Sequence, residues 1–316
     1  MPVNRHEWVR ADRRRAGQDG LLAQFRISSN AIYPFACDGV IYLLRLAPEE
    51  EKSAVDIRAE LEFVEYLRAE GYPALRFVPS LRGGLWERVE HNGITYHATV
   101  SARVPGVQLG EVPLTPGIVE GYGKMLGWLH RLSAQYVPAQ ERKGYSEVLD
   151  WIAEILKMHS APPASREEVS LVRKMLDNLP RHADTFGLIH YDFELDNVFY
   201  DGQMKAYHAI DFDDSMYHFF AMDIHQALDS LREEMDDQAY WENEAAFLNG
   251  YRTEHTLDES WPSMPVFRRF ARLYGYARCL RSLHETFEGE PEWMTNLRVR
   301  LHGVMRETVQ GFGHPV

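Results

Sequence analysis

Two hydrophobic patterns divide the chain. In the first hundred residues, short segments rich in β-branched and aromatic residues are separated by turn residues, which is typical of strands and hairpins. Asp38-Gly39 and His91-Asn92-Gly93 are hairpin signals, because Asp, Asn and Gly readily adopt positive φ angles. The predicted strands cover residues 22–27, 31–37, 40–47, 85–90 and 94–100.

The second pattern is helical, with apolar residues three and four positions apart. It occurs once early, over residues 49–71, where Gly71 ends the predicted helix. Later it is interrupted by residues 187–210, which are predicted to form strand, loop, strand, Asp-Gly turn and strand. The later helical segments cover residues 119–136, 146–159, 166–179 and most of 221–310.

A short connector rich in Pro and Gly, Ser101–Gly110, separates the two patterns. We therefore expect an α+β fold of two lobes. The boundaries are a small antiparallel-sheet lobe with one helix (residues 1–100), a hinge (101–110) and a larger, mainly helical lobe (111–316).

Composition narrows the possible partners. The formal charge of −13 over 316 residues argues against a nucleic-acid partner, because phosphate-binding surfaces are basic. No apolar run reaches the roughly 20 residues that span a bilayer, so we expect no membrane partner. The basic N-terminal stretch lacks the apolar segment of a secretory signal.

The cysteines and histidines add little chemistry. Cys37 and Cys279 form neither a disulfide framework nor a metal motif, and none of the 14 histidines has metal-ligand spacing. These features predict a cytoplasmic protein without a structural metal. They leave the oligomeric state open.

The strand-rich stretch that interrupts the helical pattern contains the candidate catalytic residues. His190, Asp192 and Asn197 share one loop, and the strand after the Asp201-Gly202 turn ends at Asp211. Because a hairpin joins the two parts, we expect Asp192, Asn197 and Asp211 to lie close together. This order, H-x-D-x-x-x-x-N followed by I-D-F-D, is much more specific than an acidic loop.

Phosphoryl transfer requires such a set of side chains. One Asp orients or deprotonates the attacking hydroxyl, while an Asn and a second Asp hold Mg²⁺ on the nucleotide phosphates. Mg²⁺ prefers the oxygen ligands that these side chains offer. We predict Asp192 as the catalytic residue and Asn197 and Asp211 as the metal ligands.

The segment resembles the catalytic region of the aminoglycoside phosphotransferase and choline kinase-like family, relatives of the protein kinases. The resemblance implies a two-lobed kinase-like fold with ATP and Mg²⁺ between the lobes. The family's loop is H-G-D-x-x-x-x-N, and here Tyr191 occupies the Gly position. The loop backbone therefore does not rely on Gly at this point.

The resemblance also implies a phosphate-binding basic residue on the third strand, which is Arg45 here, since Lys52 lies beyond that strand. Glu60 falls inside the apolar stripe of the predicted helix, and an unpaired buried carboxylate is costly. We therefore predict an Arg45–Glu60 ion pair. The alternatives are a surface Arg and a partly exposed Glu.

The remaining nucleotide contacts are also implied by the resemblance. The loop over the phosphates lacks Gly and contains Ser28, Ser29 and Asn30, whose polar groups could contact phosphate or form an ordinary turn. Backbone groups from Ser101 to Arg103 are expected to meet adenine. Leu43 is expected to cover the base, or else to belong to the core.

Two residues are predicted to support the loop. Asp223, at the start of a helix, is expected to hold the loop backbone, although a carboxylate there also suits the helix dipole. His190 is expected to orient the loop rather than transfer protons. Asp213 and Asp214 either reach a second Mg²⁺ or the substrate, or are solvated.

The expected function is ATP- and Mg²⁺-dependent transfer of the γ-phosphoryl group to a hydroxyl of a small molecule, an aminoglycoside-like or amino-alcohol acceptor. The acids within residues 229–238 either face a polyamine or form a solvated helix face. The alternatives are a metabolite kinase for choline or homoserine, a bacterial Ser/Thr protein kinase, and a nucleotide-binding pseudokinase. A metallohydrolase is disfavoured, because it would need His-rich metal spacing.

Overall fold

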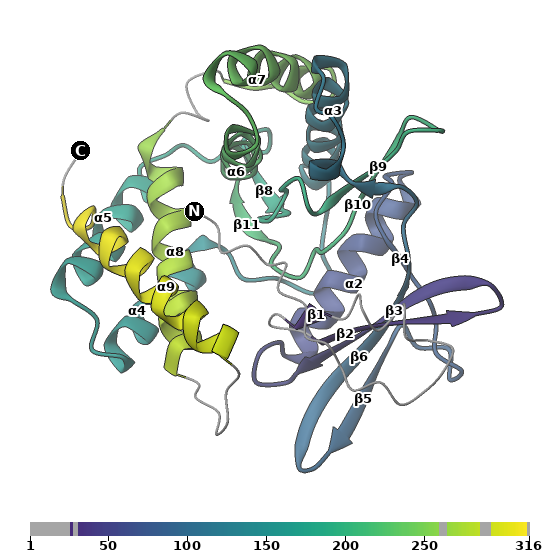
Figure 1. Cartoon of the computed structure of the whole chain (residues 1–316), viewed down its shortest axis with the longest axis horizontal. Helices are drawn as coiled ribbons and strands as arrows, with labels where there is room; N and C mark the ends of the chain where they lie inside the picture. The colour runs from purple at the N-terminus through teal and green to yellow at the C-terminus, as the bar shows by residue number, and fades with distance from the viewer. Residues whose placement is uncertain (1–25, 28–30, 259–263, 285–291, 315–316) are drawn as a thin grey trace.

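A computed structural model describes residues 26–27, 31–258, 264–284 and 292–314 of the chain. The predicted strand residues 22–25 and the expected nucleotide-loop residues Ser28, Ser29 and Asn30 lie outside these ranges. Figure 1 shows a twisted sheet with one helix against it, followed by a larger group of helices. This is the α+β arrangement that the two hydrophobic patterns predict.

The small lobe is an antiparallel sheet in the order β1-β2-β3-β6-β4, with β5 also paired to β6. Asp38 and Gly39 have φ angles of 51° and 77°, and Asn92 and Gly93 have 51° and 79°. Both pairs therefore form the tight hairpin turns that the sequence indicates. The strands are β1 (Arg26–Ile27), β2 (Ala31–Cys37), β3 (Val40–Pro48), β4 (Arg76–Phe77), β5 (Trp86–His91) and β6 (Ile94–Ala102).

The helix of this lobe, α2 (Ala54–Ala69), has well-defined ends. Ser53 and Asp56 form a reciprocal capping box at its start, which satisfies amide groups that have no partner within the helix. Gly71 follows its end with a φ angle of 85°, a conformation that favours Gly. The buried face consists of Ile57, Ala59, Glu60, Leu61, Phe63, Val64 and Leu67.

The large lobe contains one two-stranded and one three-stranded sheet among its helices. β8 pairs with β11, and β9 pairs with both β10 and β7. These elements are β7 (Val107–Gln108), η1 (Leu109–Glu111), β8 (Phe186–Ile189), β9 (Val198–Asp201), β10 (Ala206–Ala209) and β11 (Met216–Phe219). The helices are α3 (Pro116–Ser133), α4 (Tyr145–Met158), α5 (Pro163–Asp177), α6 (Phe220–Glu233), α7 (Asp237–Arg252), α8 (Pro265–His284) and α9 (Glu292–Gln310).

Three local details differ from the sequence prediction. The connector expected from Ser101 begins later, because β6 continues through Ala102. Within it, β7 pairs with β9 and so joins the connector to the hairpin of the large lobe. The turn between β9 and β10 spans residues 202–205 rather than two residues, and Asp201 caps it by accepting from the amides of Gln203 and Met204.

Two hydrophobic cores meet at the segment that carries the candidate site. One core joins α2 of the small lobe to α3, α6 and α7, and it includes Phe193 and Phe212. The other joins α4, α5, α8 and α9, and it includes Ile189, Tyr191 and Met216. The loop after β8 therefore places neighbouring side chains in different cores, which fixes its position.

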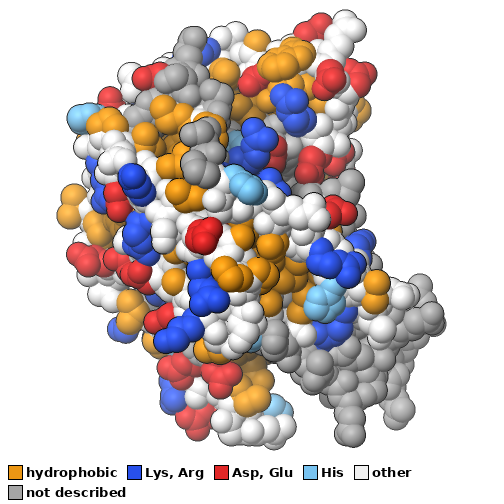
Figure 2. All heavy atoms as spheres, turned by 90° about the vertical axis from the view of Figure 1, so that its left-hand side faces the viewer, with side chains coloured by type: hydrophobic (Ala, Val, Ile, Leu, Met, Phe, Trp, Pro, Cys, Tyr) orange, Lys and Arg blue, Asp and Glu red, His pale blue; other side chains and the backbone are white. Residues whose placement is uncertain are grey.

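The outer face of α4, α5, α8 and α9 is shown in Figure 2. Basic and acidic side chains are interspersed over its described part, with apolar patches between them. No helix among the described residues is long and apolar enough to cross a membrane.

Candidate active site

A buried carboxylate holds the loop that follows β8. Asp223, in the first turn of α6, accepts hydrogen bonds from the backbone amides of His190 (2.8 Å) and Tyr191 (2.7 Å). His130 contacts the same carboxylate at 3.1 Å and Tyr251 at 2.8 Å through its other ring nitrogen. Burial lowers the pKa of His130, although Asp223 opposes this shift.

Tyr191 adopts a backbone conformation that favours Gly. Its φ angle is 66°, so the residue at the family's Gly position takes the left-handed conformation despite its side chain. Such a conformation costs free energy and persists only where the surroundings impose it. The hydrogen bond to Asp223 and the ring contacts with Phe270 and Tyr274 supply that constraint.

His190 links the loop to the strand that precedes Asp211. Its Nδ1 atom accepts from the amide of Asp192 at 3.2 Å, so its Nε2 atom carries the proton and donates to the carbonyl of Ile210 at 2.9 Å. Both nitrogens of this neutral imidazole are used in orienting the backbone. This geometry suits the expected supporting role and leaves no ring nitrogen for a substrate.

Asp192 and Asn197 are in direct contact. The Nδ2 group of Asn197 donates to the Asp192 carboxylate (2.8 Å) and to the Asp192 carbonyl (2.9 Å), and both residues are 5% exposed. The amide of Ile210 donates to the Asn197 carbonyl at 3.0 Å. Asp211, the next residue, has a φ angle of 64°. The three residues expected to share one site are therefore brought together.

Arg45 and Glu60 form a two-pronged ion pair between β3 and α2. The distances are 2.9 Å and 2.6 Å, and the side chains are 13% and 2% exposed. Burial by itself would lower the pKa of Arg45, but the charge and hydrogen bonds of Glu60, together with the nearby acids, outweigh burial and raise this pKa. Asp213 and Asp211 act in the same direction, so the guanidinium also lies near the Asp211 loop.

The expected adenine contacts differ in their surroundings. Leu43 is half-buried and lies two positions before Arg45, on the same face of β3. Ser101 lies opposite Leu43 in the sheet. The amide of Arg103 donates to the carbonyl of Ile41 at 3.0 Å. The Arg103 amide is thus engaged within the sheet, and the contact of adenine with backbone groups from Ser101 to Arg103 stays a prediction.

Sequence reasoning missed a cationic group beside the Asp211 loop. Lys52 donates to the carbonyl of Asp213 at 2.6 Å and to the carboxylate of Asp214 at 3.1 Å. Arg278 of α8 binds the other oxygen of Asp214 at 2.8 Å. The one available signal was that Lys52 is the only Lys in the first hundred residues.

These ion pairs change the pKa values of the groups involved. Burial opposes the charged form of Lys52, but Asp213 and Asp214 outweigh burial and raise the pKa of Lys52. Burial likewise opposes the charged form of Asp213, and the Lys52 ammonium lowers the pKa of that carboxyl. Asp213 and Asp214 are therefore paired acids rather than solvated ones.

Helix α2 is anchored to the large lobe on the side away from the sheet. The carboxylate of Glu62 accepts from the hydroxyl of Tyr136 (3.0 Å) and from the amides of Ala139 (2.6 Å) and Gln140 (2.9 Å). Tyr66 donates to the carbonyl of Leu132 at 3.0 Å. These bonds fix α2, and with it Glu60, relative to the loop that holds Asp192.

The acids considered for a polyamine, including Asp229 on α6, are exposed. Glu233, Glu234, Asp236 and Asp237 are exposed at the end of α6 and the start of α7, and Asp236 caps α7 through the amide of Ala239. The exposure of these acids agrees with the alternative that they form a solvated helix face.

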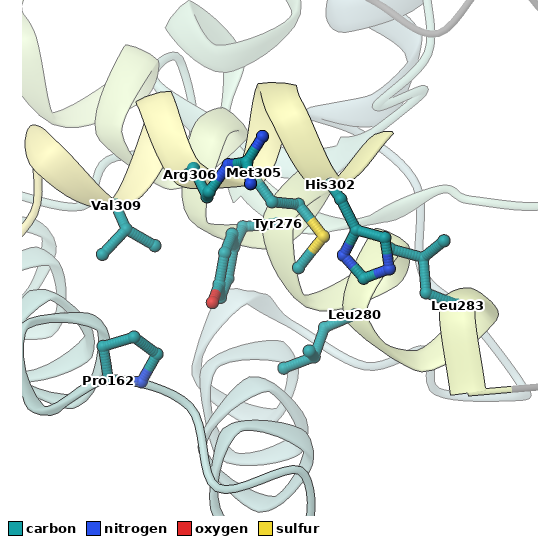
Figure 3. A pocket seen from close by; sticks show the side chains of 8 residues that line it. All are labelled: Pro162, Tyr276, Leu280, Leu283, His302, Met305, Arg306 and Val309. Atoms are coloured by element: carbon teal, nitrogen blue, oxygen red, sulfur yellow. The ribbon is translucent and has the colours of Figure 1, made fainter. Parts of the chain in front are cut away.

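A cavity of about 500 Å³ lies between α8, α9 and the start of α5 (Figure 3). It is on the opposite side of α8 from the catalytic loop, since Tyr274 and Arg278 face that loop while Tyr276 and Leu280 line the cavity. The cavity is therefore separate from the candidate site.

Comparison with known proteins agrees with this geometry. Residues 37–259 match the phosphotransferase enzyme family, so the chain belongs to that family. The predicted family, the α+β kinase-like fold and the class of enzyme, a phosphotransferase with an alcohol group as acceptor, are confirmed.

Among curated relatives, amicoumacin kinase of Bacillus subtilis is 27% identical over 289 residues, covering 86% of this chain and 84% of the relative. Homoserine kinase of Caulobacter vibrioides is 25% identical over 234 residues, covering 71% and 70%. The two relatives differ in the acceptor that their names give.

Solved structures share the fold. An amicoumacin kinase in complex with AMP-PNP, Ca²⁺ and Ami has a TM-score of 0.74 at 22% identity, covering 92% of this chain and 88% of that chain. A microcompartment-associated aminopropanol kinase has a TM-score of 0.63 at 18% identity, covering 90% of both chains.

Proposed function

We propose that this protein transfers the γ-phosphoryl group of ATP to a hydroxyl group of a small molecule that also carries an amine. The observation that carries the proposal is the contact of Asp192 with Asn197, next to Asp211 and within reach of the Arg45–Glu60 pair. Transfer of a phosphoryl group depends on positioning and charge stabilisation, which this set provides.

Asp192 acts on the acceptor. Its carboxylate accepts a hydrogen bond from Asn197, which orients it, and a carboxylate in this position can accept the proton of an incoming hydroxyl. Arg45, held in a defined orientation by Glu60, would bind the nucleotide phosphates. Leu43 and the backbone from Ser101 to Arg103 would meet the base, and Ser28, Ser29 and Asn30 would cover the phosphates.

The donor set fits Mg²⁺. Because the Nδ2 group of Asn197 faces Asp192, its carbonyl oxygen points away as an acceptor, and Asp211 adds a carboxylate. No group of three or more His, Cys, Asp or Glu that could hold a metal occurs among the described residues. A site of two protein oxygens suits Mg²⁺, which takes its remaining ligands from phosphates and water. Bound there, Mg²⁺ would neutralise charge on the phosphates.

An amine on the acceptor is supported by the relatives. Aminopropanol and homoserine, named in two relatives, each combine an amine with a hydroxyl.

The proposal also includes a cytoplasmic location and the division of the chain into a small lobe (residues 1–100), a hinge (101–110) and a large lobe (111–316).

The test is an ATP-consumption screen with Mg²⁺. The acceptors are amicoumacin, aminopropanol, homoserine, choline, an aminoglycoside, a plain sugar and a generic protein substrate. We expect turnover with an amine-bearing alcohol and none with Asp192→Asn. Turnover only with the sugar or the protein would contradict the proposal that the acceptor carries an amine. Nucleotide binding without any turnover would favour a pseudokinase.

A further inference from the structure

The cavity between α8, α9 and the start of α5 has walls that are mainly apolar (Figure 3). Tyr276 and Leu280 line it from α8, and Met305 and Val309 line it from α9. Tyr276 and Met305 are buried, while Leu280 and Val309 are only partly buried. Its volume of about 500 Å³ falls within the roughly 300–1,000 Å³ of small-molecule sites. A ligand that fits these walls carries an apolar body.

Two side chains with basic groups border the same cavity. His302 and Arg306 both belong to α9 and lie four positions apart, so they share one face of the helix. Both residues are exposed. The described residues that line the cavity include no Asp or Glu. A guanidinium at an apolar cavity without a lining acid favours a ligand that ends in an anion.

Arg306 differs from arginines that stabilise the neighbouring helix. In α8, Arg269 pairs with Glu168, and Arg278 pairs with Asp214. Arg306 forms no such pair with another residue of the described ranges. Its guanidinium is therefore available to a carboxylate from outside the fold.

We propose that this cavity binds a small carboxylate that carries an apolar chain. The chain lies between α8 and α9 against Tyr276 and Met305, and the carboxylate meets Arg306, whose planar group can bind both carboxylate oxygens. His302 offers a further ring nitrogen one turn away. The inference goes beyond the proposed function and does not depend on it, because the cavity lies on the opposite side of α8 from the catalytic loop.

Isothermal titration calorimetry with hexanoate, octanoate and decanoate tests the apolar part of the ligand. Each additional CH₂ group that is buried should lower the Kd by up to about fourfold, which corresponds to about 0.8 kcal/mol. Decanol and decyltrimethylammonium have the same chain as decanoate with a neutral and a cationic end. We expect decanoate to bind more tightly than decyltrimethylammonium. No binding of the carboxylates, equal affinity for all of them, or a cation that binds as tightly as decanoate would overturn the proposal.

The variant Arg306→Met tests the charged end of the ligand. It should weaken decanoate binding by about two- to fivefold, as expected for an exposed ion pair, and leave decanol binding unchanged. The matched control is Arg300→Met, which changes an exposed residue of the same helix that does not line the cavity. This control should bind decanoate as the wild type does. Unchanged binding by Arg306→Met, or an equal loss in both variants, would contradict the proposed site.

The variant Leu280→Trp tests whether the chain enters the cavity. The larger side chain should fill part of the cavity and remove the binding of both decanoate and decanol, while thermal unfolding shows whether the variant folds. Decanoate binding with the wild-type Kd would place the ligand elsewhere and overturn the proposal. If Leu280→Trp does not fold, the comparison of Arg306→Met with Arg300→Met decides, because both variants change exposed side chains.

A membrane phospholipid also combines an apolar chain with an anion. Sedimentation with vesicles of phosphatidylglycerol separates this source from a free carboxylate, and we expect the protein to stay in the supernatant. Sedimentation that Arg306→Met and Leu280→Trp abolish would assign the cavity to a lipid and overturn the proposal.

Discussion

At the scale of single residues, the site is built on two backbone conformations that L-amino acids rarely adopt. Tyr191 and Asp211 have φ angles of 66° and 64°. Tyr191 precedes Asp192, the proposed catalytic residue, and Asp211 is a proposed metal ligand. Left-handed residues of this kind cost about 1–3 kcal/mol each, and they cluster at functional sites. The surrounding hydrogen bonds to Asp223 and from His190 offset that cost.

Asp192→Asn is the residue-scale prediction. The side chain is nearly the same shape, so the fold and nucleotide binding should persist, while the proton acceptor and its charge are lost. Turnover should fall by roughly 10²–10⁴-fold, the usual contribution of a positioned general base, with little change in the KM for ATP. Steady-state kinetics with an acceptor from the screen measures this.

The control is Asp237→Asn, an exposed acid in the first turn of α7, which should keep wild-type turnover. Near-normal turnover of Asp192→Asn would remove Asp192 from the catalytic role.

At the scale of elements, the ion pair between β3 and α2 couples two parts of the small lobe. A buried charge that loses its partner destabilises a protein more than the loss of both partners. Arg45→Ala and Glu60→Ala should therefore each destabilise the fold, and the double variant should be less destabilised than the sum. We expect a coupling within about 0.5–3 kcal/mol from urea unfolding.

The exposed Arg82–Glu87 pair is the control for this cycle, since its side chains are 85% and 30% exposed. Its coupling should be near zero, because exposed pairs contribute little. Additive losses at Arg45 and Glu60 would show that their contact does not stabilise the fold.

A second element-scale prediction concerns pH and strand β11. Burial lowers the pKa of His218 to about 3, so the folded state holds this imidazole neutral. The unfolded chain takes up a proton near pH 6.5, so stability falls as the pH drops below that value, by up to about 1.4 kcal/mol per pH unit. His218→Asn should flatten this slope in urea unfolding at pH 7.5 and 5. An unchanged slope would assign the acid sensitivity to other groups.

Element-scale features were largely predictable from the sequence, while contacts between distant segments were not. The hairpin turns and α2 follow from periodicity and turn chemistry, which are local. The Arg45–Glu60 pair needed the family resemblance for Arg45 as well as the helix periodicity for Glu60. Lys52 lies just before α2 and meets Asp213 161 positions away. Only the packing of the lobes creates that contact, so no local pattern marks it.

At the scale of the whole molecule, nucleotide binding between the lobes should stabilise the fold. A ligand at about 100 times its Kd stabilises by roughly 2.7 kcal/mol, which thermal unfolding detects. We expect millimolar Mg·ATP or Mg·ADP to raise the Tm. The Mg²⁺-dependent part of the shift should be lost in Asp211→Ala and Asn197→Ala. No shift for the wild type would count against the kinase proposal.

The anchoring of α2 by Glu62 has a consequence for control of the enzyme. In kinases that are switched on and off, the equivalent helix must swing so that its Glu leaves the phosphate-binding residue. Here such a movement would break three hydrogen bonds to residues 136–140 and the bond from Tyr66 to Leu132. The four bonds therefore favour the arrangement in which α2 keeps Glu60 paired with Arg45.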